Sequence, residues 1–167
     1  MAEFTDLEIL AKYKTWADEV FYHAISKLPD EELRRDRPML FSNILRLLNH
    51  IYSMDVVWKS HLKGKPHNLE TRNPDSSSSF ADLRSAQAKI NSWYENYIDG
   101  LPVEKYREMV NFTFIGGGQG KMRRFEIIQH VVNHASYHRG HIEGVLYQLS
   151  IEPPTTDMPV FLREIHS

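Results

Sequence analysis

Hydrophobic residues near the start of the chain recur every three or four positions, which predicts a first helix. A Thr5-x-x-Glu8 capping box marks its beginning, and Phe4 and Ile9 on either side of the cap predict a hydrophobic staple. Pro29 ends the helix, because proline lacks the N–H group that would continue the hydrogen bonding. The polar residues 29–41 that follow predict a connection.

Two further helices are predicted from apolar segments that begin after a serine. Ser42 is the predicted N-cap of the second helix, which is apolar nearly all round and therefore belongs at the centre of a bundle. Gly64 ends this helix, and the polar residues 63–79 predict a loop. Ser79 caps the third helix, and Gly100 closes it.

The pattern changes after residue 107. Hydrophobic and polar residues alternate from Val110 to Phe114, a glycine-rich turn covers 116–120, and residues 121–123 pair back, which predicts a small β-hairpin. A fourth helix is predicted from about residue 124 to 149, without a clear N-cap, followed by an extended tail with a short turn at 160–162. These elements predict an all-α fold: an antiparallel up-down four-helix bundle with a small β-hairpin before the last long helix, forming a single domain over residues 1–167.

The composition narrows the possible functions. A chain of 167 residues, 41 % of them hydrophobic, can bury a core without disulfides. A net charge of −2 provides no basic surface for nucleic acid, and the absence of cysteine excludes thiolate ligands and a cysteine nucleophile. We expect no signal peptide, because the N-terminal residues lack a basic start and an apolar run, and no membrane span, because no stretch is apolar enough. We therefore expect a cytoplasmic protein that binds neither nucleic acid nor a membrane.

Histidine is the unusual component, because four of the nine histidines lie between residues 130 and 141. His134 and His138 are four residues apart on a helix, so their imidazoles are neighbours and can converge on one metal ion. Both share a face with apolar residues, which directs them into the bundle. His50 lies within the apolar second helix and is the candidate third ligand. Three imidazoles leave coordination positions open, which is typical of a catalytic site for zinc, nickel or a similar ion.

Other interpretations of the histidines stay open. His130 lies four residues before His134, but the helical repeat turns it progressively away from the face of His134 and His138, so it has either a supporting or a surface role. His141 is an alternative ligand of lower rank. A metal site closed by a fourth side chain would be structural, and the histidines could also form a hydrogen-bonded network without metal. We expect the remaining histidines to be solvated: His23, His61, His67 and His166.

Several familiar enzyme patterns are missing. The segment between His134 and His138 has no glutamate, which disfavours a metalloprotease of the His-Glu-x-x-His kind. Neither the Glu-x-x-His motif of di-iron bundles nor the Gly-x-Ser-x-Gly motif of serine hydrolases occurs. Catalytic residues are not identified: Asp55 either orients a ligand or lies on the surface, and Arg139 either binds a substrate carboxylate or forms a salt bridge.

The sequence resembles the DinB/YfiT-like family of proposed metalloenzymes over essentially its whole length. The resemblance rests on Leu47-Leu48-Asn49-His50-Ile51 and on His134-x-x-x-His138-Arg139-Gly140-His141, since the family has one histidine on its second helix and His-x-x-x-His-Arg-Gly-Gln on its fourth. His141 departs from this pattern, because glutamine is commoner at that position.

The resemblance implies a four-helix bundle, frequently a homodimer, with a zinc, nickel or similar divalent ion held by His50, His134 and His138. Better-understood relatives act on low-molecular-weight thiols, so the resemblance implies a small-molecule substrate, with a thiol as one possibility. Two activities are compatible with this resemblance, namely that of a small-molecule (thiol) transferase and that of a hydrolase. The alternative is a non-catalytic metal-binding module for stress response or interaction.

Overall fold

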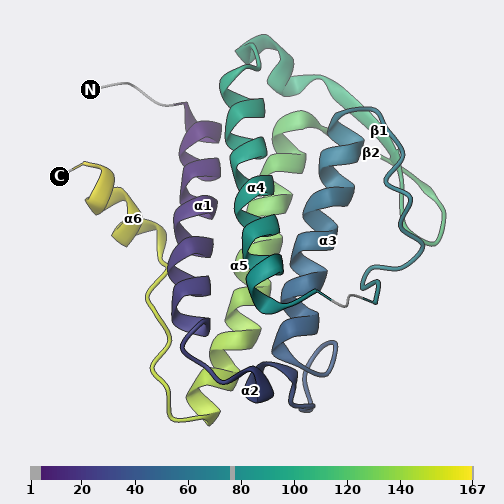
Figure 1. Cartoon of the computed structure of the whole chain (residues 1–167). Coiled ribbons are helices and arrows are strands. Elements are labelled where there is room, and N and C mark those ends of the chain that lie inside the picture. Colours follow the sequence, from purple (N-terminus) through teal and green to yellow (C-terminus); the bar gives the residue numbers. More distant parts are fainter. Residues whose placement is uncertain (1–4, 76–77, 167) are drawn as a thin grey trace.

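Four long helices pack side by side (Figure 1) in the structure, a computed structural model that describes residues 5–75 and 78–166. They are α1 (Asp6–Ile25), α3 (Ile44–Leu62), α4 (Phe80–Asp99) and α5 (Arg124–Gln148). The shorter elements are α2 (Asp30–Arg34), the 3₁₀ helix η1 (Val103–Arg107), β1 (Met109–Thr113), β2 (Gln119–Arg123) and α6 (Met158–Ile165). The predicted four-helix bundle with a hairpin before its last long helix is confirmed.

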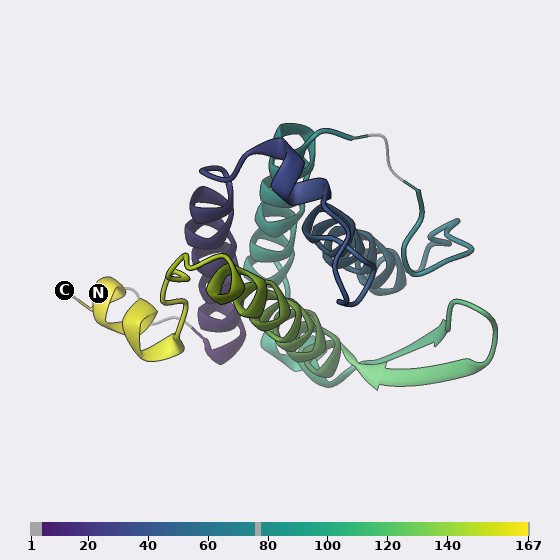
Figure 2. The same cartoon turned by 90° about the horizontal axis from the view of Figure 1, so that it is seen from below.

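The directions of the helices differ in one respect from strict up-down alternation. Each of α1 and α3 contacts both α4 and α5, so the helices form a closed bundle (Figure 2). Within it α3 and α4 run in the same direction: Asp55 accepts a hydrogen bond from Gln87 at 2.8 Å, and one turn later Lys59 Nζ lies 4.9 Å from the Trp93 ring. The long connection between α3 and α4 allows this, because it returns the chain to the end of the bundle at which α3 began.

The observed caps explain where α1 and α3 begin. The capping box of α1 is present, with the Thr5 hydroxyl accepting from the Glu8 N–H. Phe4 of the predicted staple lies outside the described residues, as do residues 76 and 77 of the predicted loop. For α3 the predicted cap was wrong by one position: Asn43, not Ser42, accepts the N–H of the third helical residue at 2.9 Å. Ser42 adopts a φ of 64° in the preceding turn, which takes it out of the capping position.

Two segments that were predicted as irregular contain short helices. Residues 30–34 form α2, where three acidic residues follow Pro29 and favour the positive end of a helix. The closing turn predicted at 160–162 is part of the eight-residue α6, whose first turn includes a proline. Phe161 of α6 is buried against α1, with its ring centroid 5.9 Å from that of Tyr13 and 5.6 Å from that of Trp16.

The hairpin leads directly into α5. Its strands pair antiparallel from Met109 opposite Arg123 to Thr113 opposite Gln119. Three consecutive glycines in the turn have φ values of +90° to +100°, which residues with a side chain rarely adopt. The start of α5, unclear from sequence, is marked by the Glu126 carboxylate, which accepts the N–H of Arg123 at 2.6 Å. Among the described residues, no helix is both long enough and apolar enough to cross a membrane.

Candidate metal centre

Three histidines from two antiparallel helices meet inside the bundle. His50 projects from α3, and His134 and His138 project from successive turns of α5. One ring nitrogen of each lies within 4.8 Å of the others. The Nε2 atom of His134 is 3.1 Å from Nε2 of His50 and 3.1 Å from Nε2 of His138. The structure therefore brings together all three candidate ligands, while metal binding by them stays a prediction.

The protonation of His50 is set by the loop after α3. Its Nδ1–H donates to the carbonyl oxygen of Arg72 at 2.6 Å, and because a carbonyl only accepts, Nε2 presents a lone pair to the other histidines. The loop is held in place by the residue before His50: Asn49 Nδ2 donates to the Pro74 carbonyl at 2.9 Å and to Asn73 Oδ1 at 3.2 Å. This arrangement resembles the outer hydrogen bonds that orient histidine ligands in metal sites.

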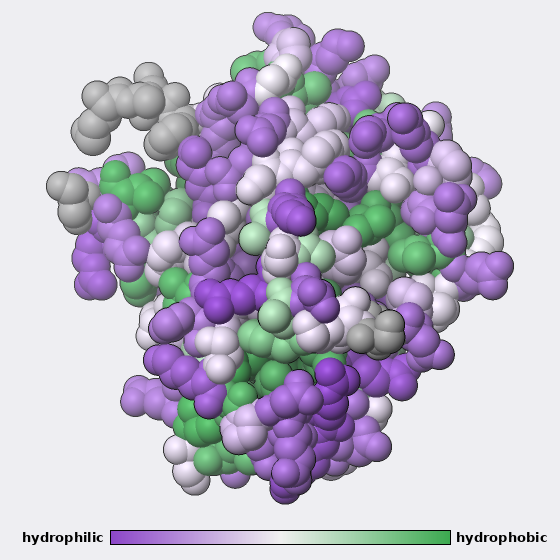
Figure 3. Space-filling model, in the orientation of Figure 1, coloured by the Kyte–Doolittle hydropathy of each residue, from purple (hydrophilic) through white to green (hydrophobic). Residues whose placement is uncertain are grey.

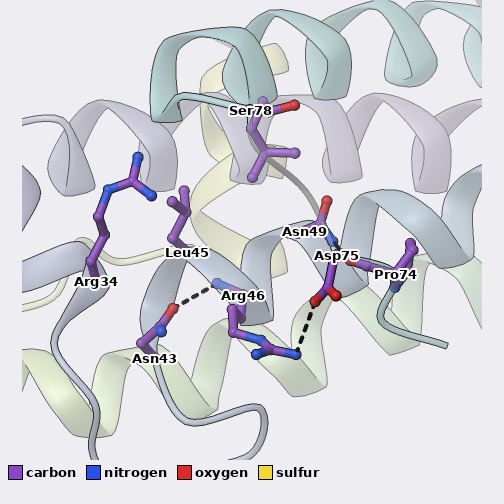
Figure 4. A pocket seen from close by; sticks show the side chains of 9 residues that line it. Arg34, Asn43, Leu45, Arg46, Asn49, Pro74, Asp75 and Ser78 are labelled. Atoms are coloured by element: carbon purple, nitrogen blue, oxygen red, sulfur yellow. Dashed lines mark hydrogen bonds and ion pairs between the residues drawn. The ribbon is translucent and has the colours of Figure 1, made fainter. Parts of the chain in front are cut away.

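A separate cavity, which Asn49 and Pro74 help to line, is shown in Figure 4. It has a volume of about 590 Å³ and is lined by polar and apolar residues, including Arg46 and Asp75, whose charged groups are 3.9 Å apart. It contains none of the three histidines. Its contribution to the centre is indirect, because Asn49 and Pro74, which line it, fix the loop that positions His50.

The electrostatics of the cluster fit a divalent cation. Burial and neighbouring imidazoles lower the pKa of His134 to about 3, and the same causes lower the pKa of His138 to about 4, so both rings are neutral at pH 7. The orphaned Nδ1 atom of His134 is the ring nitrogen that does not face the cluster, so this ring lacks an outer hydrogen bond of the kind His50 makes among the described residues. In a tetrahedral site with zinc–nitrogen bonds of about 2.0–2.1 Å, ligand nitrogens are roughly 3.3 Å apart, which is close to the two 3.1 Å distances from His134, while all three nitrogens lie within 4.8 Å.

These low pKa values predict how the metal-free protein responds to acid. Between pH 6.5 and about 4 the unfolded chain binds protons at His134 and His138 that the folded chain does not, so the free energy of unfolding should fall as the pH falls. Urea unfolding of chelator-treated protein at several pH values measures this dependence. The double variant His134→Ala/His138→Ala should show a shallower dependence, and equal slopes in the two proteins would contradict the assignment.

The three histidines line a cavity of about 660 Å³, a volume typical of small-molecule sites. The hairpin forms one wall and α3 and α5 form others. Among the described residues that line it there is no aspartate or glutamate. Its aromatic lining, beyond the histidines, consists of Phe41, Trp58, Phe112, Phe114 and Tyr137.

Two more histidines line this cavity. His130 is half-buried, with its ring centroid 5.7 Å from that of His134, so it lies beside the three converging histidines but outside their group. His61, expected to be solvated, is half-buried against Trp58, 5.3 Å between ring centroids. The same expectation was wrong for His67, which packs against His61, and right for the exposed His23 and His166. His141 Nδ1 is 3.4 Å from His138 Nδ1, on the side of that ring away from the cluster.

The sequence matches the DinB family over residues 1–165. The chain belongs to the DinB family. The chain is similar to Protein DinB of Bacillus subtilis (strain 168), with 23 % identity over 159 residues that cover 92 % of this chain and 91 % of that protein. The resemblance inferred from the histidine motifs is thus confirmed at the level of the family.

In this DinB-family chain, Asp55 and Arg139 belong to a buried polar network and not to the cavity. Lys14 Nζ donates to Asp18 at 2.9 Å, to Asp55 at 2.8 Å and to Asn91 at 2.7 Å, and Arg139 donates to Asp18 at 2.7 Å. Asp55 is 1 % exposed, so its surface interpretation was wrong, and its side chain accepts from Lys14 and Gln87, with no hydrogen bond to a candidate ligand histidine among the described residues. The salt-bridge interpretation of Arg139 is confirmed. A signal for this network was available, because Lys14 and Asp18 interrupt the apolar stripe of the first helix.

Proposed function

We propose that the protein is a divalent-metal-dependent enzyme that transfers a group to or from a low-molecular-weight thiol. The observation that carries this proposal is the convergence of three neutral imidazoles on a cavity whose described lining contains no carboxylate. Zinc and nickel suit an all-imidazole donor set. Such an ion supplies one piece of chemistry: it lowers the pKa of a thiol that binds to it, so that the thiol reacts as a nucleophile near neutral pH.

The residues of the chain have separable roles in this proposal. His50, His134 and His138 hold the ion, and the Arg72 carbonyl fixes the orientation of His50. Burial lowers the pKa of His130, so its imidazole is neutral at pH 7 and can accept the proton that leaves the thiol. The reaction balances as loss of the S–H proton, formation of a carbon–sulfur bond, and departure of the leaving group of the electrophile with its electron pair.

Hydrolysis is the second candidate, because the same ion would activate water. The described lining offers no glutamate, which disfavours a zinc hydrolase of the His-Glu-x-x-His kind, whereas His130 could act as the base in either reaction. A non-catalytic metal site would need a fourth protein ligand, whereas the group found among the described residues has three. Formation of a homodimer stays a prediction.

The proposal is tested by turnover with a simple thiol. Tag-free protein loaded with one equivalent of Zn²⁺ or Ni²⁺ is mixed with N-acetylcysteine and an aryl halide, and thioether formation is followed at pH 7. We expect faster thioether formation than without protein, and loss of that acceleration in chelator-treated protein and in the His134→Ala variant. Hydrolysis of p-nitrophenyl acetate without thiol transfer would favour the hydrolase, and no turnover of either would overturn the proposal.

A further inference from the structure

Large hydrophobic side chains are exposed around the histidine cavity. Leu40, Phe114 and Tyr137 line it and are 45 %, 52 % and 63 % exposed. They come from three separate places: the segment before α3, the hairpin and α5. The face of the molecule in Figure 3 shows hydrophobic surface near α3 and also toward the lower end of the bundle, so the site is marked by the residues that line the cavity and not by surface hydropathy alone. Because exposed hydrophobic groups that converge on one cavity mark a binding site, this lining indicates a ligand with a substantial apolar part.

The lining beside the histidines indicates what shape that apolar part has. Trp58 of α3 lies between Phe112 and His130, with ring centroids 5.0 Å and 4.9 Å away and interplanar angles of 76° and 66°. Phe114 stands at 83° to Phe112, 5.1 Å between centroids. A planar ligand ring that lies between two nearly perpendicular protein rings can stack on one of them and make an edge-to-face contact with the other. The cavity therefore suits an aromatic ring better than a flexible aliphatic chain.

The charge of the cavity favours an anion. Arg72 is an exposed residue of the loop after α3 that lines the cavity beside His50, and none of the ion pairs found among the described residues includes it. Across the described part of the chain, no carboxylate lines the cavity to balance it. A guanidinium presents several N–H donors in one plane, which matches the geometry of a carboxylate.

We propose that the cavity binds an aromatic anion, with its ring against Trp58, Phe112 and Phe114 and its acidic group at Arg72. This ligand class would be the organic co-substrate that reacts with the thiol, so its role rests on the proposed function. The binding of the aromatic anion does not rest on the proposed function, because every contact named is made by side chains other than the three candidate metal ligands.

Binding to chelator-treated, full-length protein tests the proposal without turnover. The probe is 2-naphthoate, compared by calorimetry with its neutral counterpart 2-naphthamide and with the non-aromatic cyclohexanecarboxylate. Phe114→Ala, at an exposed position that spares the core, should weaken naphthoate about five- to tenfold. Arg72→Gln, which keeps the carbonyl that holds His50, should weaken naphthoate about tenfold and leave naphthamide within about twofold. The matched control is Tyr147→Ala, because Tyr147 is 68 % exposed on α5 and does not line the cavity.

Each outcome decides one part of the proposal. Equal affinities for naphthoate and cyclohexanecarboxylate, or equal effects of Phe114→Ala and Tyr147→Ala, would overturn the aromatic site. Equal loss of naphthoate and naphthamide in Arg72→Gln would overturn the anion site. Since no metal or thiol is present, these failures leave the proposed transferase standing. Naphthoate binding as expected, without thiol transfer in the loaded protein, would overturn the proposed function alone.

Discussion

Replacing His134 by alanine should lower the affinity of the protein for Zn²⁺ at least a hundredfold. His134 is the central member of the cluster, because its Nε2 atom lies 3.1 Å from the facing nitrogen of both His50 and His138. Substitution of groups that only support metal ligands lowers affinity about 10- to 100-fold, so loss of a ligand should meet or exceed that range. The loop would still orient His50 in this variant, but His138 would be the only candidate ligand left on α5.

Competition against a chromophoric chelator measures this affinity, and elemental analysis of tag-free protein gives the stoichiometry. The matched control is His130→Ala, one turn earlier on α5 and in the same cavity, but outside the group of converging nitrogens. It should retain about one equivalent of metal. Similar losses in the two variants would contradict the assignment of ligands. A parent protein that takes up neither zinc nor nickel would show that the histidines form a hydrogen-bonded network instead.

The helices could be predicted because each carries a local signal in the sequence. Apolar spacing located α1, α3, α4 and α5, and the alternation before residue 115 located the hairpin. The shared direction of α3 and α4 carries no such signal, since it depends on how the connection between them crosses the bundle. The cap at Asn43 was missed for a related reason: Ser42 is an equally good capping residue, and only the conformation of the preceding turn excludes it.

The centre itself could be predicted, but not what surrounds it. Imidazoles four residues apart on an apolar helical face must lie together, and His50 stood out in an apolar helix. The partner of His50 is a backbone carbonyl, which every residue type offers, so nothing in the sequence singled out Arg72. The aromatic wall depends on the hairpin folding over α3 to bring Phe112 to Trp58, a contact between residues more than fifty positions apart.

The network around Lys14 should have the largest effect on stability. Its ammonium group is buried and is shared by Asp18 and Asp55, which come from different helices. In Lys14→Met both carboxylates would stay buried with only Arg139 as a charged partner, at Asp18. Removing one member of a buried ion pair costs about 3–5 kcal/mol, because the charge left behind is no longer compensated. We expect the free energy of unfolding to fall by about that amount in urea titrations at pH 8.

Substitution of an exposed lysine on the same helix is the control, because it shows how much stability is lost when any lysine of α1 is replaced. Lys12 forms a partly exposed pair with Glu95 at 3.7 Å, so Lys12→Met should change stability by less than about 1 kcal/mol.

The pH dependence of the stability loss in Lys14→Met identifies its cause. Burial raises the pKa of Asp55 and Lys14 opposes that rise, so without Lys14 the carboxyl takes up a proton more readily and its unpaired charge disappears. The deficit of Lys14→Met should therefore shrink between pH 8 and pH 5, whereas a deficit that is equal at both would assign the loss to packing.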